Sequence, residues 1–180
     1  MKTTQTKAHK LCLSTALIIS ALFTQGAWAC KTPEVTGYDL VLCLSGDLAG
    51  VRKDDKWGAV DKTGQVVIPL QYDRISFPTN AKDLMRAEKD GKWGFIDHKG
   101  NEIVPLQYNF VLMFGEGLAG VEKDGKWGFI DNTGKVVIPL EFTWIESDFD
   151  NGVAIVHKIN EQGHSHRLKI DKMGNILAGE

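Results

Sequence analysis

The feature that constrains this chain most is a hexapeptide that recurs along it. Lys126–Asp131 reads Lys-Trp-Gly-Phe-Ile-Asp, Lys92–Asp97 is identical, and Lys56–Asp61 reads Lys-Trp-Gly-Ala-Val-Asp. A fourth copy keeps only its end, Lys169-Ile170-Asp171. The aspartates that close the four copies lie 36, 34 and 40 residues apart. Self-similarity at such a period is the signature of stacked small units, so the sequence predicts a tandem repeat.

Two-residue turns precede the hexapeptides. Asp124-Gly125 and Asp90-Gly91 are the dipeptides that β-hairpin turns prefer, and Asp54-Asp55 takes the same place in the first copy. Within the strand that follows, alternate side chains point to opposite faces, and both faces are apolar or bare. Each such strand is therefore predicted to lie between other layers. The glycine has no side chain and is therefore predicted to let a bulky side chain of a neighbouring unit approach closely. An indole is the candidate for that side chain. The pairs assigned to this framework are Trp57-Gly58, Trp93-Gly94 and Trp127-Gly128.

A second turn follows each hexapeptide. In Asp131-Asn132-Thr133-Gly134 the carboxylate is expected to accept amide hydrogen bonds, and the glycine to take the left-handed conformation. Calcium binding or acid catalysis by these aspartates is the alternative, but each loop brings only one acid. The next strand, 135–138, is predicted to stop at Pro139, and a short extended piece, 140–145, ends the unit. The repeat is therefore predicted to be a small antiparallel meander, without helices after the leader.

The pattern Lys-Trp-Gly-Phe-Ile-Asp, turn, Gly, then Val-Val-Ile-Pro-Leu resembles the bacterial WG-repeat proteins, also called KWG repeats. The resemblance covers nearly all of the chain after residue 29. It implies an all-β repeat protein, often exported and usually without an assigned activity, and it brings no catalytic motif. The chain departs from the pattern at Ala59 in the first copy. It also departs in the fourth copy, which has Arg167-Leu168 where Trp-Gly is expected.

The ends of the array suggest how it is arranged. The approximate units are 47–80, 81–114, 115–148 and 149–180, and 37–46 resembles the end of a repeat. This segment is predicted to complete the fourth unit, which would close the four units into a propeller-like ring. The alternative is an open β-solenoid with capped ends.

Residues 1–29 resemble a secretion signal peptide, expected to be helical. A basic front with three lysines precedes the apolar run 11–23, and Ala27-Trp28-Ala29 offers the small residues of a cleavage site. A retained membrane anchor is the alternative, although the run is short for a bilayer. Without this leader the chain keeps 18 basic and 23 acidic residues, a net charge of about −5, which disfavours nucleic acid as a partner. The protein, residues 30–180, is therefore predicted to be periplasmic or secreted.

Two cysteines remain after the leader. Cys30 and Cys43 are predicted to form a disulfide in an oxidising compartment. The alternative is lipidation of Cys30, which would make the protein an outer-membrane lipoprotein and, once the leader is removed, is the only route to a membrane that the sequence offers.

Function is expected where the repeats differ. Three variable segments follow the same strand of successive repeats, and they supply the candidate binding residues Phe77, Phe114, Trp144, Asp148 and Phe149. Aromatic side chains beside carboxylates suit protein or sugar recognition, whereas the alternative is that these rings close the core. His164 and His166, in a predicted hairpin, are weak candidates for a metal site.

No phosphate loop, nucleophile elbow or zinc-helix motif is present, so neither enzymatic activity nor a cofactor is predicted. The sequence predicts an exported binding or scaffold protein that recognises a macromolecule of the cell envelope, with another protein as the first candidate. The alternatives are a cell-wall glycan-binding module, an inhibitor or immunity protein against an envelope toxin, and an envelope hydrolase with an unrecognised site.

Overall fold

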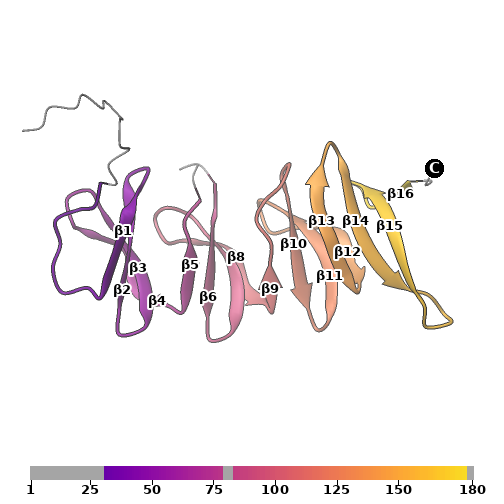
Figure 1. The fold of residues 1–180 in the computed structure, drawn as a ribbon, viewed down its shortest axis with the longest axis horizontal. Coiled ribbons are helices and arrows are strands. Elements are labelled where there is room, and N and C mark those ends of the chain that lie inside the picture. The colour runs from indigo at the N-terminus through magenta and orange to yellow at the C-terminus, as the bar shows by residue number, and fades with distance from the viewer. Residues whose placement is uncertain (1–30, 79–82, 178–180) are drawn as a thin grey trace, which may run out of the picture.

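A computed structural model describes residues 31–78 and 83–177, and it shows a row of four antiparallel sheets with four strands each (Figure 1). The first sheet contains β1 (Leu40–Ser45), β2 (Leu48–Lys53), β3 (Lys56–Asp61) and β4 (Val66–Tyr72). The second contains β5 (Arg74–Ser76), β6 (Met85–Lys89), β7 (Lys92–Ile96) and β8 (Glu102–Tyr108). The third contains β9 (Phe110–Val111), β10 (Leu118–Lys123), β11 (Lys126–Asp131) and β12 (Val136–Phe142). The fourth contains β13 (Trp144–Asp150), β14 (Val153–Ile159), β15 (Ser165–Asp171) and β16 (Ile176–Leu177).

The all-β prediction is confirmed, since these residues contain no helix. No membrane-spanning helix is therefore found among them. The predicted signal helix, 1–29, and Cys30 lie outside the described residues. Cys43 lies in β1, and its predicted disulfide to Cys30 stays a prediction. The sheets recur with the same period as the predicted sequence units, but their boundaries are shifted. The first strand of each sheet comes from the end of the preceding sequence unit.

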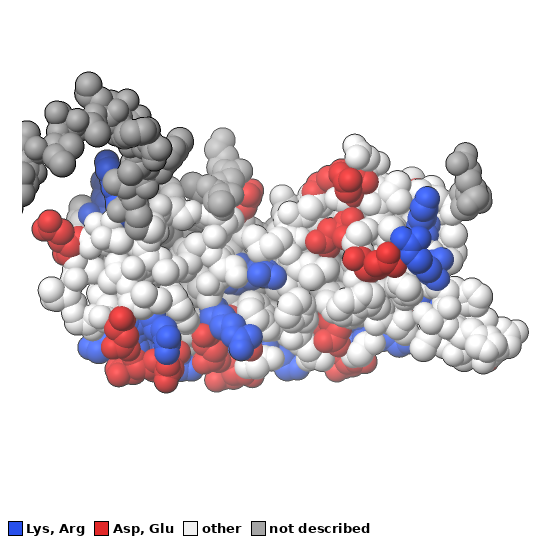
Figure 2. Space-filling model, in the orientation of Figure 1, with Lys and Arg blue, Asp and Glu red and all other residues white. Residues whose placement is uncertain are grey.

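Both kinds of predicted turn are present, the hairpin turn before each hexapeptide and the aspartate turn after it. Asp90 and Gly91 have φ of 52° and 73°, and Asp54 and Asp55 have φ of 48° and 61°, so the hairpin turns use left-handed residues as expected. Figure 2 shows that charged side chains gather along the edge where these hairpins turn and over the fourth sheet, whereas the band between is largely uncharged.

The turn aspartates cap their loops. The Oδ1 of Asp131 accepts hydrogen bonds from the amides of Thr133 (2.9 Å) and Lys135 (3.1 Å) and from the Thr133 hydroxyl (2.6 Å). The Thr133 hydroxyl is the first cause of the lowered pKa of Asp131. The same amide contacts recur at Asp61, Asp97 and Asp171. These four carboxylates therefore serve the turns.

The core lies between successive sheets, which stack face to face. In the cluster between the second and third sheets, Trp93 and Phe95 of β7 pack against Ala119, Val121 and Ile130 of β10 and β11. The register of β10 with β11 puts Ala119 opposite Ile130 and Gly120 opposite Phe129, so the two faces of one sheet enter different clusters. Both faces of a middle sheet are thus buried, as the apolar pattern predicts.

The prediction that an indole packs against the repeated glycine is wrong. A Cβ on Gly128 would lie 2.6 Å from the carbonyl oxygen of Ile138 and 2.8 Å from the nitrogen of Leu140, so the close neighbour is the backbone of β12. The prediction that Pro139 ends the third strand is also wrong. β12 runs through Pro139 to Phe142, and its pairing with β11 shifts register between Phe129 and Trp127. Proline is tolerated there because β12 is an edge strand with an irregularity at this point.

The expected closure into a ring is wrong, and the open arrangement is found. β1 and β16 lie at opposite ends of the row (Figure 1), and β1 pairs with β2 of its own sheet. The segment before β1 is a cap, because Val35 and Tyr38 pack against the buried Val51 and Val60 of the first sheet. In the fourth sheet, Arg167 and Lys169 replace the tryptophan and phenylalanine that the second and third sheets bury, and the described chain has no further sheet over them. Polar outer faces of this kind end a solenoid.

Candidate binding groove

A row of aromatic side chains crosses the junctions between the second, third and fourth sheets. Its members, in order, are Trp93, Phe110, Trp127 and Trp144, and the distances between successive ring centroids are 5.8, 6.1 and 5.6 Å. Trp93 and Trp127 are 7% exposed, whereas Phe110 is 40% and Trp144 is 55% exposed. Buried indoles of the repeat motif thus alternate with exposed rings at positions that vary between repeats.

The connection between sheets explains the alternation. Phe110 begins β9 two residues after β8 ends, and Trp144 begins β13 two residues after β12 ends. Phe110 and Trp144, the first residues of the third and fourth sheets, therefore lie beside the indole of the preceding sheet. Phe110 pairs with Glu122, which also pairs with Trp127, so one row of the third sheet carries both rings.

The exposed rings border a cavity of about 220 Å³. It is lined by Phe110, Leu112, Trp127, Trp144 and Ile145, and this set of five residues is called the aromatic groove below. Leu112 and Ile145 are anchored by the core between the third and fourth sheets, so the floor of the groove is part of the rigid packing. A concave apolar surface that keeps an exposed tryptophan is suited to binding.

A charged cluster adjoins the groove at Trp144. Glu146 accepts hydrogen bonds from Arg167 Nε (2.8 Å) and Nη2 (2.9 Å), and His157 Nε2 lies 2.9 Å from the same carboxylate. His157 pairs with both Trp144 and Arg167 in the sheet, which places the cluster beside the exposed indole. The Arg167 guanidinium, followed by His157, lowers the pKa of Glu146 to about 2, and Glu146 in turn raises the pKa of Arg167.

Comparison with known families assigns this architecture. The family model described as "WG containing repeat" matches residues 37–57, 57–93, 93–127 and 127–158. The chain belongs to the WG-repeat family. Comparisons of this WG-repeat chain with curated proteins and with solved structures find no match.

The structure separates the predicted binding residues of this WG-repeat chain. Phe149 is 5% exposed and packs edge-on against Phe129 at a centroid distance of 4.9 Å. Phe114 packs against Phe95 at 4.6 Å, and Phe77 is partly buried against the cluster between the first two sheets. Phe149 is thus part of the core, Phe77 and Phe114 pack against it while partly buried, and of the predicted aromatics Trp144 is the exposed one.

Asp148 does not line the aromatic groove, and its side chain is exposed. Burial raises the pKa of Asp148, and the charge of Arg86 opposes that effect. Arg86 donates hydrogen bonds to the carbonyl of Val111 (3.1 Å) and the hydroxyl of Ser76 (3.2 Å), and its guanidinium carbon lies 5.8 Å from the Trp93 ring centroid. Burial lowers the pKa of Arg86. The hydrogen bond from Arg86 to Val111 thus connects the second sheet of the WG-repeat chain to the third.

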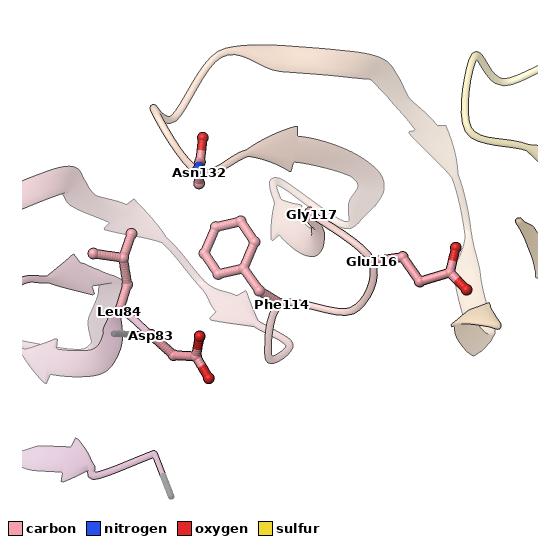
Figure 3. A pocket seen from close by; sticks show the side chains of 6 residues that line it. All are labelled: Asp83, Leu84, Phe114, Glu116, Gly117 and Asn132. Carbon is pink, nitrogen blue, oxygen red and sulfur yellow. The ribbon is translucent and has the colours of Figure 1, made fainter. Parts of the chain in front are cut away.

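A second cavity, of about 370 Å³, lies where the second and third sheets meet and is lined by Asp83, Leu84, Phe114, Glu116, Gly117 and Asn132. Figure 3 shows the Phe114 ring between Leu84 and Asn132, while the Glu116 side chain points away. That carboxylate contacts Lys172 Nζ at 2.7 Å and accepts a hydrogen bond from the amide of Gly152 at 3.1 Å, so it fastens the third sheet to the fourth. Lys172 lowers the pKa of Glu116. The cavity therefore offers less recognition chemistry than the aromatic groove.

The two candidate metal ligands, His164 and His166, lie at the β14–β15 hairpin. The amide of His164 donates a hydrogen bond to Asn160 Oδ1 (2.9 Å), and His166 Nε2 lies 2.7 Å from Asn160 Nδ2. Within 31–78 and 83–177, no group of three or more His, Cys, Asp or Glu side chains is arranged to hold a metal ion.

Sequence reasoning missed Phe110. A signal was present, because aligning the repeats puts Leu40, Arg74, Phe110 and Trp144 at one position. That position is variable and follows an aromatic residue by two, and it is the one that the fold leaves exposed at each junction.

Proposed function

We propose that this WG-repeat protein is an exported, non-enzymatic binding protein that recognises another protein through the aromatic groove. The observation that supports the proposal most is Trp144. It is more than half exposed, it lies in contact with Trp127, and it borders a cavity with Phe110. Tryptophan and arginine are enriched among the residues that contribute most of the binding energy at protein–protein interfaces.

The orientation of the rings favours a protein over a flat sugar face. Trp127 makes an angle of 60° with Phe110 and 78° with Trp144, so the groove consists of ridges and notches. Side chains of a polypeptide can fill notches individually. The Glu146–Arg167 pair is held by two parallel hydrogen bonds, and such pairs at the rim of an apolar patch provide orientation.

The predicted export of the protein is consistent with binding to another protein outside the cytoplasm. The leader 1–29 and the pair Cys30 and Cys43 fit a protein made for an oxidising compartment. A partner would accordingly be a protein of the cell envelope or the medium. Mass spectrometry of the protein from the producing cell tests this part. A mature N-terminus at Cys30 with two cysteines joined is expected, whereas an acylated Cys30 would support the lipoprotein alternative and an intact leader would contradict export.

The binding proposal is tested by cross-linking in the cell. Full-length protein is made with p-benzoylphenylalanine in place of Phe110 and is irradiated, the cross-linked protein is identified, and that protein is purified. Its Kd is then measured with the wild type, with Trp144→Ala and with Leu40→Ala. Leu40 is the matched control because it occupies the Phe110 position in the first sheet and is 41% exposed.

We expect Trp144→Ala to weaken binding by about 30-fold, as loss of an interface anchor does, and Leu40→Ala to leave the Kd within about 3-fold. Equal affinities for the wild type and Trp144→Ala would refute the proposal. A cross-linked glycan in place of a protein would also refute it and would support the glycan-binding alternative.

A further inference from the structure

We propose that the aromatic groove holds the guanidinium group of an arginine side chain supplied by the partner protein. The inference rests on the proposed function, because it names the chemistry of the residue that the groove binds. The occupant is one cationic side chain, whatever the backbone conformation of the segment that carries it. The preceding junction of the same chain shows how such a group is held, because there the chain provides the arginines itself.

At the junction between the second and third sheets, an arginine of β6 lies over the indole of the repeat. The guanidinium carbon of Arg86 is 5.8 Å from the centroid of the Trp93 ring. Its Nη1 donates a hydrogen bond to the carbonyl of Val111 in the third sheet (3.1 Å), and its Nη2 donates one to the hydroxyl of Ser76 (3.2 Å). A cation within about 6 Å of an indole face is attracted by the ring. An indole, a hydroxyl and a carbonyl of the next sheet thus hold this guanidinium.

The aromatic groove is the same place one junction later. Arg86 lies opposite Phe95 in the second sheet as Gly120 lies opposite Phe129 in the third, so glycine stands at the arginine position. The three residues that contact Arg86 have counterparts among those that line the groove; Trp93, Ser76 and Val111 correspond to Trp127, Leu112 and Ile145. The cavity of about 220 Å³ therefore lies where the preceding junction holds a guanidinium.

The strand beside the groove cannot supply that group. A Cβ on Gly120 would lie 2.7 Å from Cδ1 of Ile145 and 2.9 Å from Cδ1 of Leu112. These two aliphatic side chains occupy the space through which the stem of an arginine would pass, so a side chain at position 120 reaches Trp127 only if both move. A cation that binds in the groove must therefore enter from outside.

A carboxylate of the third sheet lies in the same row as the rings. In the second sheet, Glu88 forms an ion pair at 3.3 Å with Arg74, the residue opposite it in β5. In the third sheet, Glu122 takes the position of Glu88, and the residue opposite it is Phe110. The first carboxylate is thus compensated by an arginine of the chain, and the second has a phenylalanine ring in its place.

Hydrogen bonds hold Glu122 in position without compensating its charge. Its Oε1 accepts from the amide of Gly125 (2.6 Å) and from Nδ2 of Asn109 (3.3 Å), and within 31–78 and 83–177 it has no ion pair with lysine, arginine or histidine. Trp127 lies directly opposite Glu122, and the Cβ atoms of such pairs are ~5 Å apart. A cation stacked on the Trp127 ring is therefore within reach of this carboxylate.

The remaining charges agree with a cationic guest. On the other wall of the groove, Arg167 is held by Glu146 at 2.8 Å, so its charge is already compensated. Arginine suits the site better than lysine, because its planar group stacks on aromatic faces, is weakly hydrated and donates several hydrogen bonds at once to carboxylate and carbonyl oxygens. An uncharged side chain would leave Glu122 uncompensated in the interface.

The experiment is a titration of the full chain with three blocked tripeptides, Gly-Arg-Gly, Gly-Lys-Gly and Gly-citrulline-Gly. Citrulline has the shape of arginine without its charge. Binding is followed by the NMR signals of the indole N–H groups, which Trp→Phe variants assign. Trp93 and Trp57 are internal references, because Arg86 lies over the first and Arg52 lies opposite the second. We expect saturable shifts at Trp127 and Trp144, none at the references, and a Kd about 10-fold lower for the arginine peptide than for the citrulline peptide.

Three variants complete the test, and each is first shown to keep the dispersed amide spectrum of the wild type. Phe110→Arg should weaken binding of the arginine peptide by at least about 10-fold, because the new side chain can pair with Glu122 as Arg74 pairs with Glu88. Phe110→Leu, which removes the ring without adding a charge, should weaken it by only about 3-fold. Glu122→Gln should weaken it by about 5-fold, whereas Glu102→Gln, which changes an exposed carboxylate at the start of β8, should leave it unchanged.

The inference is overturned by several results. These are the absence of shifts at Trp127 and Trp144, equal affinities for the arginine and citrulline peptides, equal affinities for the arginine and lysine peptides, and unchanged binding in both Phe110→Arg and Glu122→Gln.

The outcomes distinguish the two proposals. If a purified partner binds in a Trp144-dependent manner but neither the arginine peptide nor replacement of the partner's arginines has an effect, the inference fails and the proposed function stands. If a chito-oligosaccharide, and not the arginine peptide, shifts the Trp127 and Trp144 signals, both fail. If the arginine peptide binds and no protein depends on Trp144, the proposed function fails while the chemistry of the groove holds.

Discussion

Replacing Gly128 by alanine tests the packing that defines the repeat. The new Cβ would lie 2.6 Å from the carbonyl oxygen of Ile138, whereas ordinary contact begins near 3.4 Å, so β12 must retreat by roughly 0.8 Å. The atoms in the way belong to the backbone, and no side-chain rotation relieves them. Ile138 and Phe142, on either side of the contact, are buried in the core and hold β12 in place.

The expected loss of stability follows from these contacts. Overpacking in a core costs about 1–3 kcal/mol, and the high end applies because the backbone must move. The gain from a less flexible unfolded chain returns about 0.4–1 kcal/mol. We therefore expect Gly128→Ala to lower the free energy of unfolding by about 2 kcal/mol, which moves a urea midpoint by about 1 M when m is near 2 kcal/mol/M. Tryptophan fluorescence measures the midpoint.

The control is Gly115→Ala. Its φ is not in the left-handed region and its nearest neighbours would be 3.5 and 3.7 Å from the added Cβ, so we expect a change below about 0.5 kcal/mol. Because repeat arrays can unfold in parts, hydrogen exchange of β11 and β12 amides should locate the loss at this junction. Equal stability of Gly128→Ala and Gly115→Ala would refute the explanation given for the Trp-Gly motif.

The remaining predictions concern the core, a turn and the charged cluster. Phe149→Ala should lower the free energy of unfolding by about 3–5 kcal/mol in urea denaturation, because this ring is buried, and a loss below about 1 kcal/mol would contradict a core role. Asp55→Gly should raise the free energy of unfolding by up to about 1 kcal/mol in thermal melts, because Asp55 has a φ of 61° where two other copies carry glycine. A lower melting temperature would contradict this and would show that the ion pair of Asp55 with Arg52 contributes more than the backbone strain costs. The carboxyl of Glu146 should titrate at about 2 by NMR, below its usual 4.5, and should return toward 4.5 in Arg167→Gln. Its contribution to stability is therefore complete above pH 4.5 and disappears as the pH falls toward 2, and a wild-type midpoint near 4.5 would contradict the pairing.

Local structure could be predicted where one residue type has one physical use. Asp90-Gly91 predicted a hairpin because few residues tolerate positive φ, and the observed angles of 52° and 73° agree. Asp131 was identified as a turn cap for the same kind of reason, since a single acid before a glycine serves its own loop. Hexapeptide alternation likewise predicted strands that are covered on both faces.

Longer-range features could not be read in this way. The strand that contains Leu40 has the sequence of a repeat end, and that pattern is equally compatible with closing a ring and with starting the first sheet. Pro139 predicts the end of a strand in isolation, but an irregular edge strand accommodates it. Phe77, Phe114 and Phe149 were candidate binding residues, with closure of the core as the alternative. Phe149 is buried and the other two are partly buried, which depends on how one sheet stacks on the next.

Variation along the row shows how a repeat of this kind can acquire a site. The position that starts each sheet is occupied by Leu40, Arg74, Phe110 and Trp144, and it lies outside the hydrogen-bonded centre of the sheet. At Phe110 and Trp144 the ring contacts the indole of the preceding sheet, and both rings remain substantially exposed. Where the residue is Arg74 the chain forms an ion pair with Glu88, and no exposed ring is added to the row. Because stacked sheets lie ~10 Å apart, substitutions at this one position would change the side chains presented along the row while the contacts of the framework residues stay in place. The framework residues therefore set the spacing of the groove, and the variable ones set its chemistry.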